Sequence, residues 1–149
     1  MGGLASRELK TAVALGDRFG IGSITKTYVA TIVLQGVDEG ILNLDDTVTT
    51  WLNDPTVDAI PNVDQVMIRQ LLTHTSGIYD YFDGDSKFWQ DAYFGPGADW
   101  SRIWTPLELL AYAGEDMHAP YFAPGEGITY SNTGYVLLGL ILEQATGRR

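Results

Sequence analysis

The chain has 149 residues, of which 45% are hydrophobic, so it is long enough to bury a sizeable core. Its 19 acidic residues outnumber its 9 basic ones, and the net charge of −10 disfavours binding to nucleic acid or to an anionic membrane. The chain lacks cysteine, which excludes disulfides and thiolate metal sites, and none of its apolar runs approaches the roughly 20 residues of a membrane span.

The amino-terminal part of the chain predicts a short strand followed by a long helix. The strand is expected around residues 11–15, and Gly20 and Gly22 permit a tight backbone turn just before Ser23. From 23 to 39, apolar residues recur at helical spacing, and a glycine at the end supplies a stop. We therefore expect Ser23 at the start of this helix.

The middle of the chain predicts a second helix and then a long irregular segment. Residues 66–73 carry apolar side chains at helical spacing, and the helix is expected to stop before Ser76 and Gly77. The stretch 79–104 is rich in aromatic, Asp and Gly residues and has no sustained period. We expect an ordered but irregular loop there.

Two more helices are predicted in the last third of the chain. Segment 105–108 combines a hydroxyl at the N-cap, a proline at the first helical position and a carboxylate three residues after the cap. This capping box predicts a helix through about residue 113. The last helix is expected to begin at Ser131 or Asn132 and to lead to the last glycine of the chain, with Tyr130 just ahead of it.

Four polar residues form the candidate chemistry. Residues three apart lie on one helix face, so the Lys26 amine can approach the Ser23 hydroxyl and serve as its base. Burial, nearby positive charge or the helix dipole would favour the neutral amine that this role needs. Tyr130 could relay a proton, and the amide of Asn132 could hold Lys26 or a substrate amide.

Each of these patterns is weak when taken alone. Ser-x-x-Lys arises easily by chance, and it describes equally a serine that caps a helix and a solvated lysine. The Tyr-x-Asn pattern at Tyr130 describes equally a packed tyrosine ahead of a helix capped by Asn. The order of several motifs along the chain is more specific than any one of them.

That ordered set resembles the serine β-lactamase and penicillin-binding family. The likeness is to the branch of class C β-lactamases, D-alanyl-D-alanine carboxypeptidases and related esterases, and it spans about residues 17–147. Its motifs are Phe19-x-x-Gly22-Ser23-x-x-Lys26, Leu42-x-Leu44-Asp45-Asp46, Ile68-Arg69-x-Leu71-Leu72-Thr73-His74-Thr75-Ser76-Gly77, Pro124-Gly125-Glu126 and Tyr130-Ser131-Asn132-x-Gly134-Tyr135.

The resemblance implies a role for each candidate residue. Ser23 would be the acylated nucleophile, and its backbone N–H would supply half of an oxyanion hole. Lys26 would accept the serine proton and Tyr130 would shuttle it, while Asn132 would lie near the substrate. No cofactor is implied.

The resemblance also implies an α+β fold of the β-lactamase/transpeptidase type, represented by a single partial domain over residues 1–149. We expect mainly its helical part with the nucleophile helix, and we expect the central antiparallel sheet to be largely missing. The family's third motif, a strand with Lys-Thr-Gly or His-x-Gly, does not occur in the 19 residues after Tyr130. Losing one oxyanion donor commonly costs about 10²–10³ in turnover.

The implied function is a serine hydrolase that forms an acyl-enzyme with a β-lactam, a D-amino-acid peptide or a small ester. The alternative is a non-catalytic or incomplete binding or assembly fragment that needs a carboxyl-terminal segment for activity. The implied partner is a small molecule or a peptidoglycan-type peptide. Exposed apolar surface would favour self-association, and the resemblance suggests an extracytoplasmic location.

The histidines and the acidic loop residues favour structural roles. His74, at a predicted helix end, is interpreted as a hydrogen-bonded structural residue, and His118 has too few companions to predict a metal site. Asp80, Asp83 and Asp85 do not match the twelve-residue calcium loop, so we expect a solvated acidic loop. We predict no metal site.

The aromatic segment leaves two interpretations open. Its rings could form the floor of a pocket for a substrate side chain, or they could pack as a small core under a long loop. Tyr79 and Tyr81 closely follow the turn at Gly77, so we predict that they contribute to the rim of a substrate site.

Overall fold

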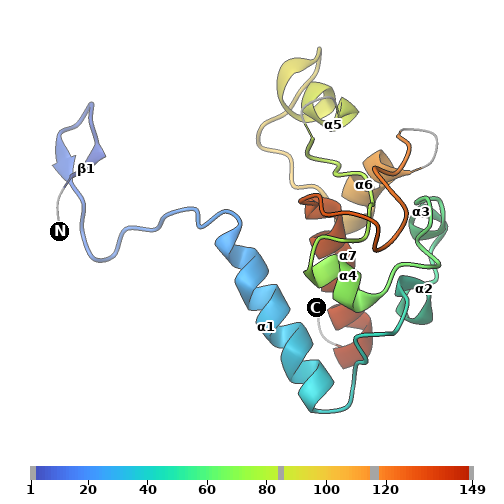
Figure 1. Ribbon diagram of the computed structural model, residues 1–149. Coiled ribbons are helices and arrows are strands. Elements are labelled where there is room, and N and C mark those ends of the chain that lie inside the picture. The colour runs from blue at the N-terminus through green and yellow to red at the C-terminus, as the bar shows by residue number, and fades with distance from the viewer. Residues whose placement is uncertain (1–2, 84–85, 115–117, 148–149) are drawn as a thin grey trace.

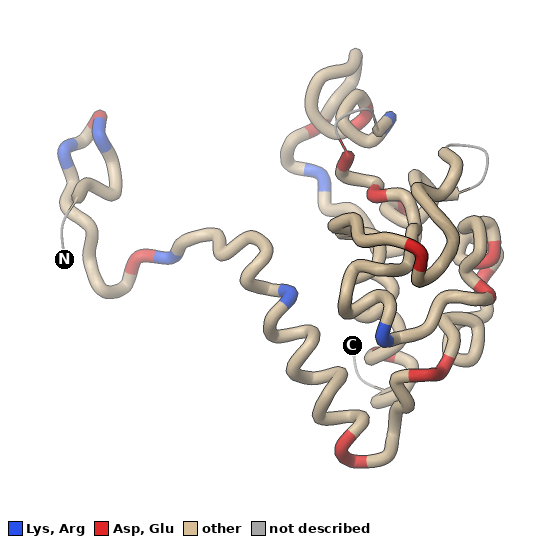
Figure 2. The backbone as a smooth tube through the Cα atoms, viewed as in Figure 1, with Lys and Arg blue, Asp and Glu red and all other residues tan. Residues whose placement is uncertain are grey.

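A computed structural model describes residues 3–83, 86–114 and 118–147 (Figure 1). The described chain consists of a helical body, with one long helix beside it and an amino-terminal arm that reaches away from both. Figure 2 marks acidic residues at many places along the backbone of the helical body, in keeping with the negative net charge. Within the described residues, no helix combines the length and apolar character needed to cross a membrane.

The amino-terminal arm carries a small hairpin at its tip. Strand β1 (Leu4–Ser6) pairs antiparallel with β2 (Thr11–Ala12), and the two form the only sheet among the described residues. The predicted strand at 11–15 is thus present but shorter. The remaining arm leads without regular structure to the turn before Ser23.

The predicted nucleophile helix is present as α1 (Ile24–Asp38), with Ser23 at its N-cap. Helix α1 packs against the last helix of the chain, and Val33 is its fully buried residue. Gly40 follows at φ +71°, a left-handed conformation that glycine adopts without strain. Three residues spaced four apart, Ile24, Tyr28 and Ile32, remain exposed along α1.

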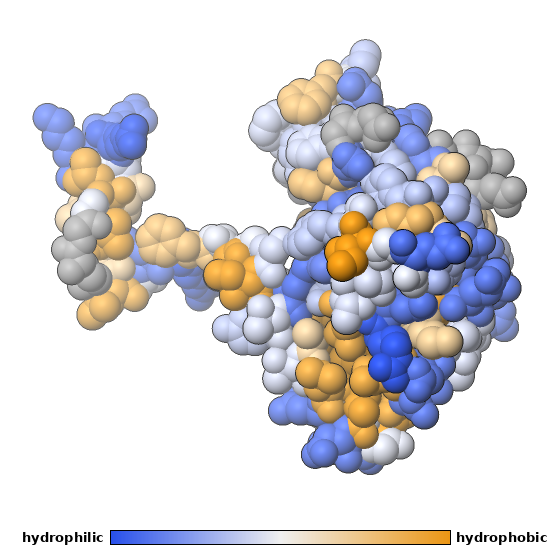
Figure 3. Space-filling view, in the orientation of Figure 1, coloured by the Kyte–Doolittle hydropathy of each residue, from blue (hydrophilic) through white to orange (hydrophobic). Residues whose placement is uncertain are grey.

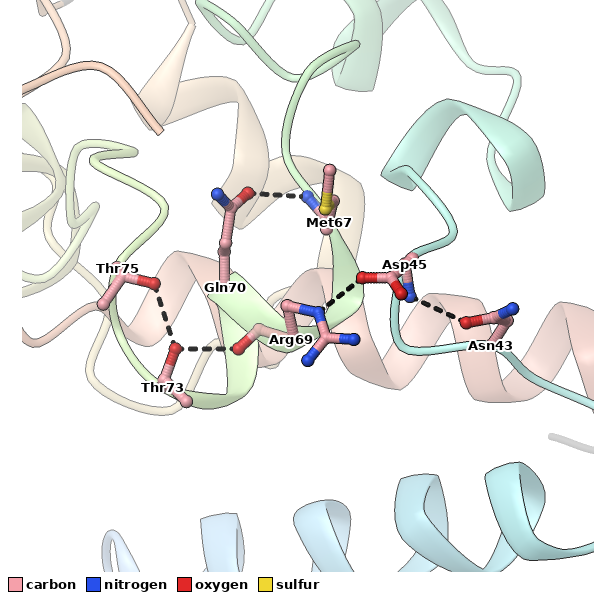
Figure 4. A network of polar contacts seen from close by, with 7 residues as sticks. All are labelled: Asn43, Asp45, Met67, Arg69, Gln70, Thr73 and Thr75. Carbon is pink, nitrogen blue, oxygen red and sulfur yellow. Dashed lines mark hydrogen bonds and ion pairs between the residues drawn. The ribbon is translucent and has the colours of Figure 1, made fainter. Parts of the chain in front are cut away.

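Three short helices follow: α2 (Val48–Trp51), α3 (Pro55–Asp58) and α4 (Ile68–Leu72). The predicted helix at 66–73 corresponds to α4. Helix α4 is linked to the connector before α2 by an ion pair, in which Arg69 Nε donates to Asp45 Oδ1 over 2.5 Å (Figure 4). At the start of α4, the Met67 N–H donates to Gln70 Oε1 over 2.9 Å.

The segment 79–104 contains more regular structure than the sequence predicted. It contains α5 (Lys87–Trp89) and a π-helical turn, η1 (Gln90–Phe94), so the prediction of an irregular loop is wrong over these residues. Phe88 is buried among aromatic rings that include Tyr81, Trp104 and Tyr112. The core interpretation of the aromatic segment therefore holds around Phe88.

The predicted capping box opens α6 (Pro106–Leu110), which continues into the 3₁₀ turn η2 (Ala111–Ala113). The Glu108 N–H donates to Thr105 Oγ1 over 3.3 Å, and the Thr105 N–H donates to Glu108 Oε2 over 2.8 Å. Two amides that the helix leaves unpaired are thereby satisfied.

Helix α7 (Asn132–Thr146) lies at the centre of the helical body (Figure 1). It contacts α1, α2, α4 and α6, and Leu137, Leu138 and Ile141 are fully buried on it. Burying side chains of this size contributes about 1.5–3 kcal/mol each. The amino end of α7 lies beside the amino end of α1, where Lys26 Nζ donates to Asn132 Oδ1.

Candidate active site

The Ser23 hydroxyl is exposed at the start of α1 and takes no part in capping the helix. Gly22 precedes it at φ +52°, and Ser23 itself has helical dihedrals, so its side chain makes no capping hydrogen bond. The interpretation of Ser23 as an ordinary capping serine is therefore wrong. Its Oγ contacts two side chains instead.

Lys26 is the first of these two contacts. Its Nζ donates to Ser23 Oγ over 3.4 Å and to Asn132 Oδ1 over 2.6 Å, so the amine is shared between α1 and α7. Nζ also lies 4.7 Å from the centroid of the Tyr130 ring and 5.5 Å from that of Tyr135. Lys26 is half-buried, so the interpretation of a freely solvated lysine is wrong.

Tyr130 is the second contact, and its Oη donates to Ser23 Oγ over 2.6 Å. Partial burial raises the pKa of Tyr130, but hydrogen bonds with Lys26 and Ser23 and the charge of Lys26 lower it by more. The net pKa therefore lies below the ordinary value of 10.0. A phenol of lowered pKa beside an amine and a hydroxyl is suited to moving a proton between them.

His74 follows the end of α4, and its ring packs against the ring of Tyr130, in agreement with its predicted structural role. Its Nδ1 accepts the Ser131 N–H over 3.2 Å, and its ring lies 4.5 Å from the Tyr130 ring and 5.2 Å from the Tyr135 ring. Burial and the charge of Lys26 lower the pKa of His74, although Asp80 opposes them. The neutral ring that accepts the amide is thereby favoured.

Asp80 is the site residue that the sequence interpretation missed. It is buried, at 6% exposure, and it accepts both the backbone N–H of Asn132 and one Nδ2 hydrogen of that residue. The expectation of a solvated Asp80 is therefore wrong. The signal in the sequence was its position directly after the large apolar pair Ile78-Tyr79, and the structure shows the run Ser76–Tyr79 to be buried throughout.

The structure places Tyr79 and Tyr81 in packed surroundings beside the site. Tyr79 is 5% exposed and stacks on His118 with centroids 3.7 Å apart. The Tyr81 N–H donates to Thr133 Oγ1 over 2.9 Å, and burial raises the pKa of its phenol. Among these two tyrosines, the half-buried Tyr81 is the one whose surface a substrate could reach.

The remaining acidic candidates lie outside the contacts around Ser23. Asp83 accepts a hydrogen bond from the Tyr121 hydroxyl, and Asp85 lies outside the described residues. Across the described ranges, no group of three or more His, Cys, Asp or Glu side chains is arranged to hold a metal ion. The chemistry suggested by the described site is that of the Ser23, Lys26 and Tyr130 side chains.

Comparison with known proteins places the chain in a family. The Beta-lactamase family model matches residues 1–149, so the chain belongs to the beta-lactamase family, and the resemblance seen in the sequence is confirmed. The chain is similar to penicillin-binding protein 4* of Bacillus subtilis (strain 168), with 32% identity over 97% of the chain and 29% of the relative. It is 35% identical to esterase EstB of Burkholderia gladioli, over 98% of the chain and 37% of the relative.

Solved structures show the same fold. A D-stereospecific amidohydrolase from Streptomyces sp. superposes with a TM-score of 0.76 at 44% identity, over 89% of this chain and 38% of that one. The chain thus spans about a third of the length of the relatives that it matches. The predicted fold class, the helical part of a β-lactamase/transpeptidase-like fold with little of the sheet, is confirmed.

Proposed function

We propose that the chain carries the acylation centre of a serine hydrolase, with Ser23 as nucleophile. The observation that carries this proposal is the convergence on Ser23 Oγ of Lys26 Nζ at 3.4 Å and Tyr130 Oη at 2.6 Å. A nucleophilic hydroxyl within hydrogen-bond reach of a base and a proton donor is the arrangement that acyl transfer needs.

In the proposed acylation, Ser23 Oγ attacks the substrate carbonyl carbon as its proton passes to the neutral amine of Lys26. The backbone N–H of Ser23, at the amino end of α1, donates to the oxyanion that forms. Tyr130 then gives a proton to the leaving amine or alcohol and recovers one from Lys26. Attack by water on the resulting ester releases the acid and restores the Ser23 hydroxyl.

The proposed substrates are β-lactams, D-amino-acid peptides and small esters. All three present a carbonyl carbon that a serine hydroxyl can attack to form an acyl-enzyme. They differ in the leaving group and in the shape of the groups that flank the carbonyl. The relatives support this range, since their names include a penicillin-binding protein, an esterase and a D-stereospecific amidohydrolase. Asn132 and the half-buried Tyr81 are the proposed substrate contacts, whereas the buried Tyr79 would act by supporting the loop.

Intact-mass measurement tests the proposal. The protein is incubated separately with a penicillin and with an activated ester, and Ser23→Ala is treated in the same way. A mass increase equal to one acyl group, seen with wild type and lost in Ser23→Ala, is the expected result. Absence of an adduct from folded wild type with both probes would reject the proposal for this chain.

A second candidate is binding or self-assembly without turnover, and the exposed apolar side chains favour it. Ile24, Tyr28 and Ile32 are 47–62% exposed along one side of α1, and Figure 3 shows further hydrophobic side chains along the arm. Patches of this kind mark association surfaces. Sedimentation at increasing concentration should show a second copy associating, and Ile32→Glu should weaken that association. A monomer at all concentrations would contradict it.

A further inference from the structure

Asp80 accepts three hydrogen bonds, and two of them join the loop after Gly77 to the amino end of α7. Its Oδ1 accepts the N–H groups of Asn132 and Phe82, each over 3.1 Å, and its Oδ2 accepts from Asn132 Nδ2 over 2.8 Å. The residue is 6% exposed. A buried carboxylate is retained at such a position only when its hydrogen-bonding capacity is used.

The chemistry of this contact determines which way the Asn132 side chain points. An ionised carboxylate only accepts hydrogen bonds, so the face of the Asn132 amide next to Asp80 must be its NH₂ group. The carbonyl Oδ1 is then directed to the other side, where Lys26 Nζ donates to it over 2.6 Å. Reversing the amide would place donors against Lys26.

From this geometry we infer that Asp80 is a positioning residue, which orients Asn132 so that Asn132 can hold the Lys26 amine beside Ser23. The inference rests on the proposed function for its effect on acylation. Its structural part, the orientation of one amide, is independent of any reaction. Among the hydrogen bonds described, Asp80 contacts neither Ser23 nor Lys26, so its hydrogen-bonded link to the base runs through Asn132. Its charge also opposes the net lowering of the pKa of His74 and of Tyr130, which is why the Asn132→Ala background is needed to isolate positioning.

The isosteric change Asp80→Asn tests this inference with little change in packing. The new amide can keep its oxygen on the N–H groups of Asn132 and Phe82, but its NH₂ group would then face the NH₂ group of Asn132. We expect the side-chain amide of Asn132 to flip, which relieves this conflict. The flip would turn the Asn132 carbonyl oxygen away from Lys26 Nζ, so the amine would lose its acceptor. Loss of the acceptor that holds the Lys26 amine beside Ser23 should slow acylation by about 10- to 100-fold.

A double-mutant cycle separates positioning from general support of the fold. Acylation rates with an activated ester are measured for wild type, Asp80→Asn, Asn132→Ala and the double variant. We expect Asp80→Asn to slow wild type 10- to 100-fold and to have less than a twofold effect once Asn132 is alanine. Equal slowing in both backgrounds would overturn the inference.

Nuclear magnetic resonance gives a readout that needs no reaction. The side-chain amide pair of Asn132 is assigned by its loss in Asn132→Ala, and in wild type one of its protons should lie downfield because it bonds to a carboxylate. Asp80→Asn should abolish that shift. An unchanged Asn132 amide pair would overturn the inference even if acylation fell.

Thr133→Val is the matched control for both measurements. Thr133 is fully buried and links the same two segments, since its hydroxyl accepts from the Tyr81 N–H and donates to the Tyr79 carbonyl. Loss of the Thr133 hydroxyl should lower thermal stability and leave the Asn132 amide signals unchanged. If wild type forms no adduct, the proposed function fails for this chain, and the amide signals alone decide the role of Asp80.

Discussion

Lys26 Nζ and Asn132 Oδ1 lie 2.6 Å apart although their residues are 106 positions apart in the sequence. The contact joins the first turn of α1 to the first residue of α7, and these two helices pack against each other. The candidate site is therefore a product of tertiary packing, because Tyr130 and Asn132 reach Ser23 and Lys26 only when the two helices are docked.

Lys26→Arg should abolish acylation of Ser23 while the chain remains folded. Arginine keeps the positive charge but has no accessible neutral form, so it cannot accept the serine proton. Loss of a general base typically costs about 10²–10⁴ in rate. The measurement is the rate of adduct formation by mass spectrometry, with circular dichroism as the control for folding. A rate within twofold of wild type would show that Lys26 is not the base.

Tyr130 should ionise below the pH of an ordinary tyrosine. Its pKa is lowered, on balance, by the hydrogen bonds with Lys26 and Ser23 and by the Lys26 charge. The difference in absorbance at 295 nm between wild type and Tyr130→Phe, followed against pH, isolates this phenol. We expect a midpoint below 10 that rises in Lys26→Met. A midpoint above 10 in wild type would contradict the described environment of Tyr130.

The stability of the chain should fall in mild acid because of His74. Since the folded-state pKa of His74 is lowered, its contribution is fully present above its ordinary value of 6.5 and is lost as the pH falls through the lowered value. Thermal unfolding at pH 7.5 and 5.0 should show a smaller pH effect in His74→Asn. Asparagine tolerates the φ of +60° at this position and cannot titrate. An equal pH effect in both proteins would exclude His74.

Glu108 should contribute stability that disappears at lower pH than an ordinary glutamate would allow. Hydrogen bonds from the Thr105 amide and hydroxyl, followed by that from Arg102, lower the pKa of Glu108 from 4.5 to about 2. The advantage of wild type over Glu108→Gln in urea unfolding should be constant above pH 4.5 and should shrink as the pH falls towards 2. An advantage that does not change between pH 7 and 2.5 would show that the charge of Glu108 does not matter.

Gly77→Ala should destabilise the fold by about 2 to 4 kcal/mol. The residue has φ +72°, and an added Cβ would lie 2.0 Å from the Phe122 carbonyl oxygen. Gly97→Ala is the matched control, because Gly97 has φ +87° but open space around it, so only backbone strain of about 1 kcal/mol is expected. If urea unfolding showed the same loss of unfolding free energy in Gly77→Ala and Gly97→Ala, the contact with Phe122 would be unimportant.

The sequence predicted the parts of this structure that local patterns encode. The spacing of Val33 and its apolar neighbours indicated α1, and the Thr105 to Glu108 capping box indicated α6. The motifs identified the family, and the comparisons confirm it. The catalytic roles assigned to Ser23, Lys26 and Tyr130 remain proposals, now supported by the contacts among them.

The features that the sequence did not predict depend on contacts between distant segments. Asp80 looked like a member of a solvated acidic loop, because its partner on α7, Asn132, lies 52 positions away in the sequence. The burial of Tyr79 likewise depends on His118, far along the chain. The π-helical turn η1 follows no simple apolar period, so periodicity alone could not indicate it.

The measurement that tests the central claim most directly is peptide mapping of the protein after reaction with a penicillin. Proteolysis and tandem mass spectrometry would locate any acyl group on a single residue, with Ser23→Ala as the control. The proposed chemistry predicts one acyl group on Ser23 and none in the variant. An acyl group on another residue, labelling that survives Ser23→Ala, or a folded wild type without any acyl group would contradict it.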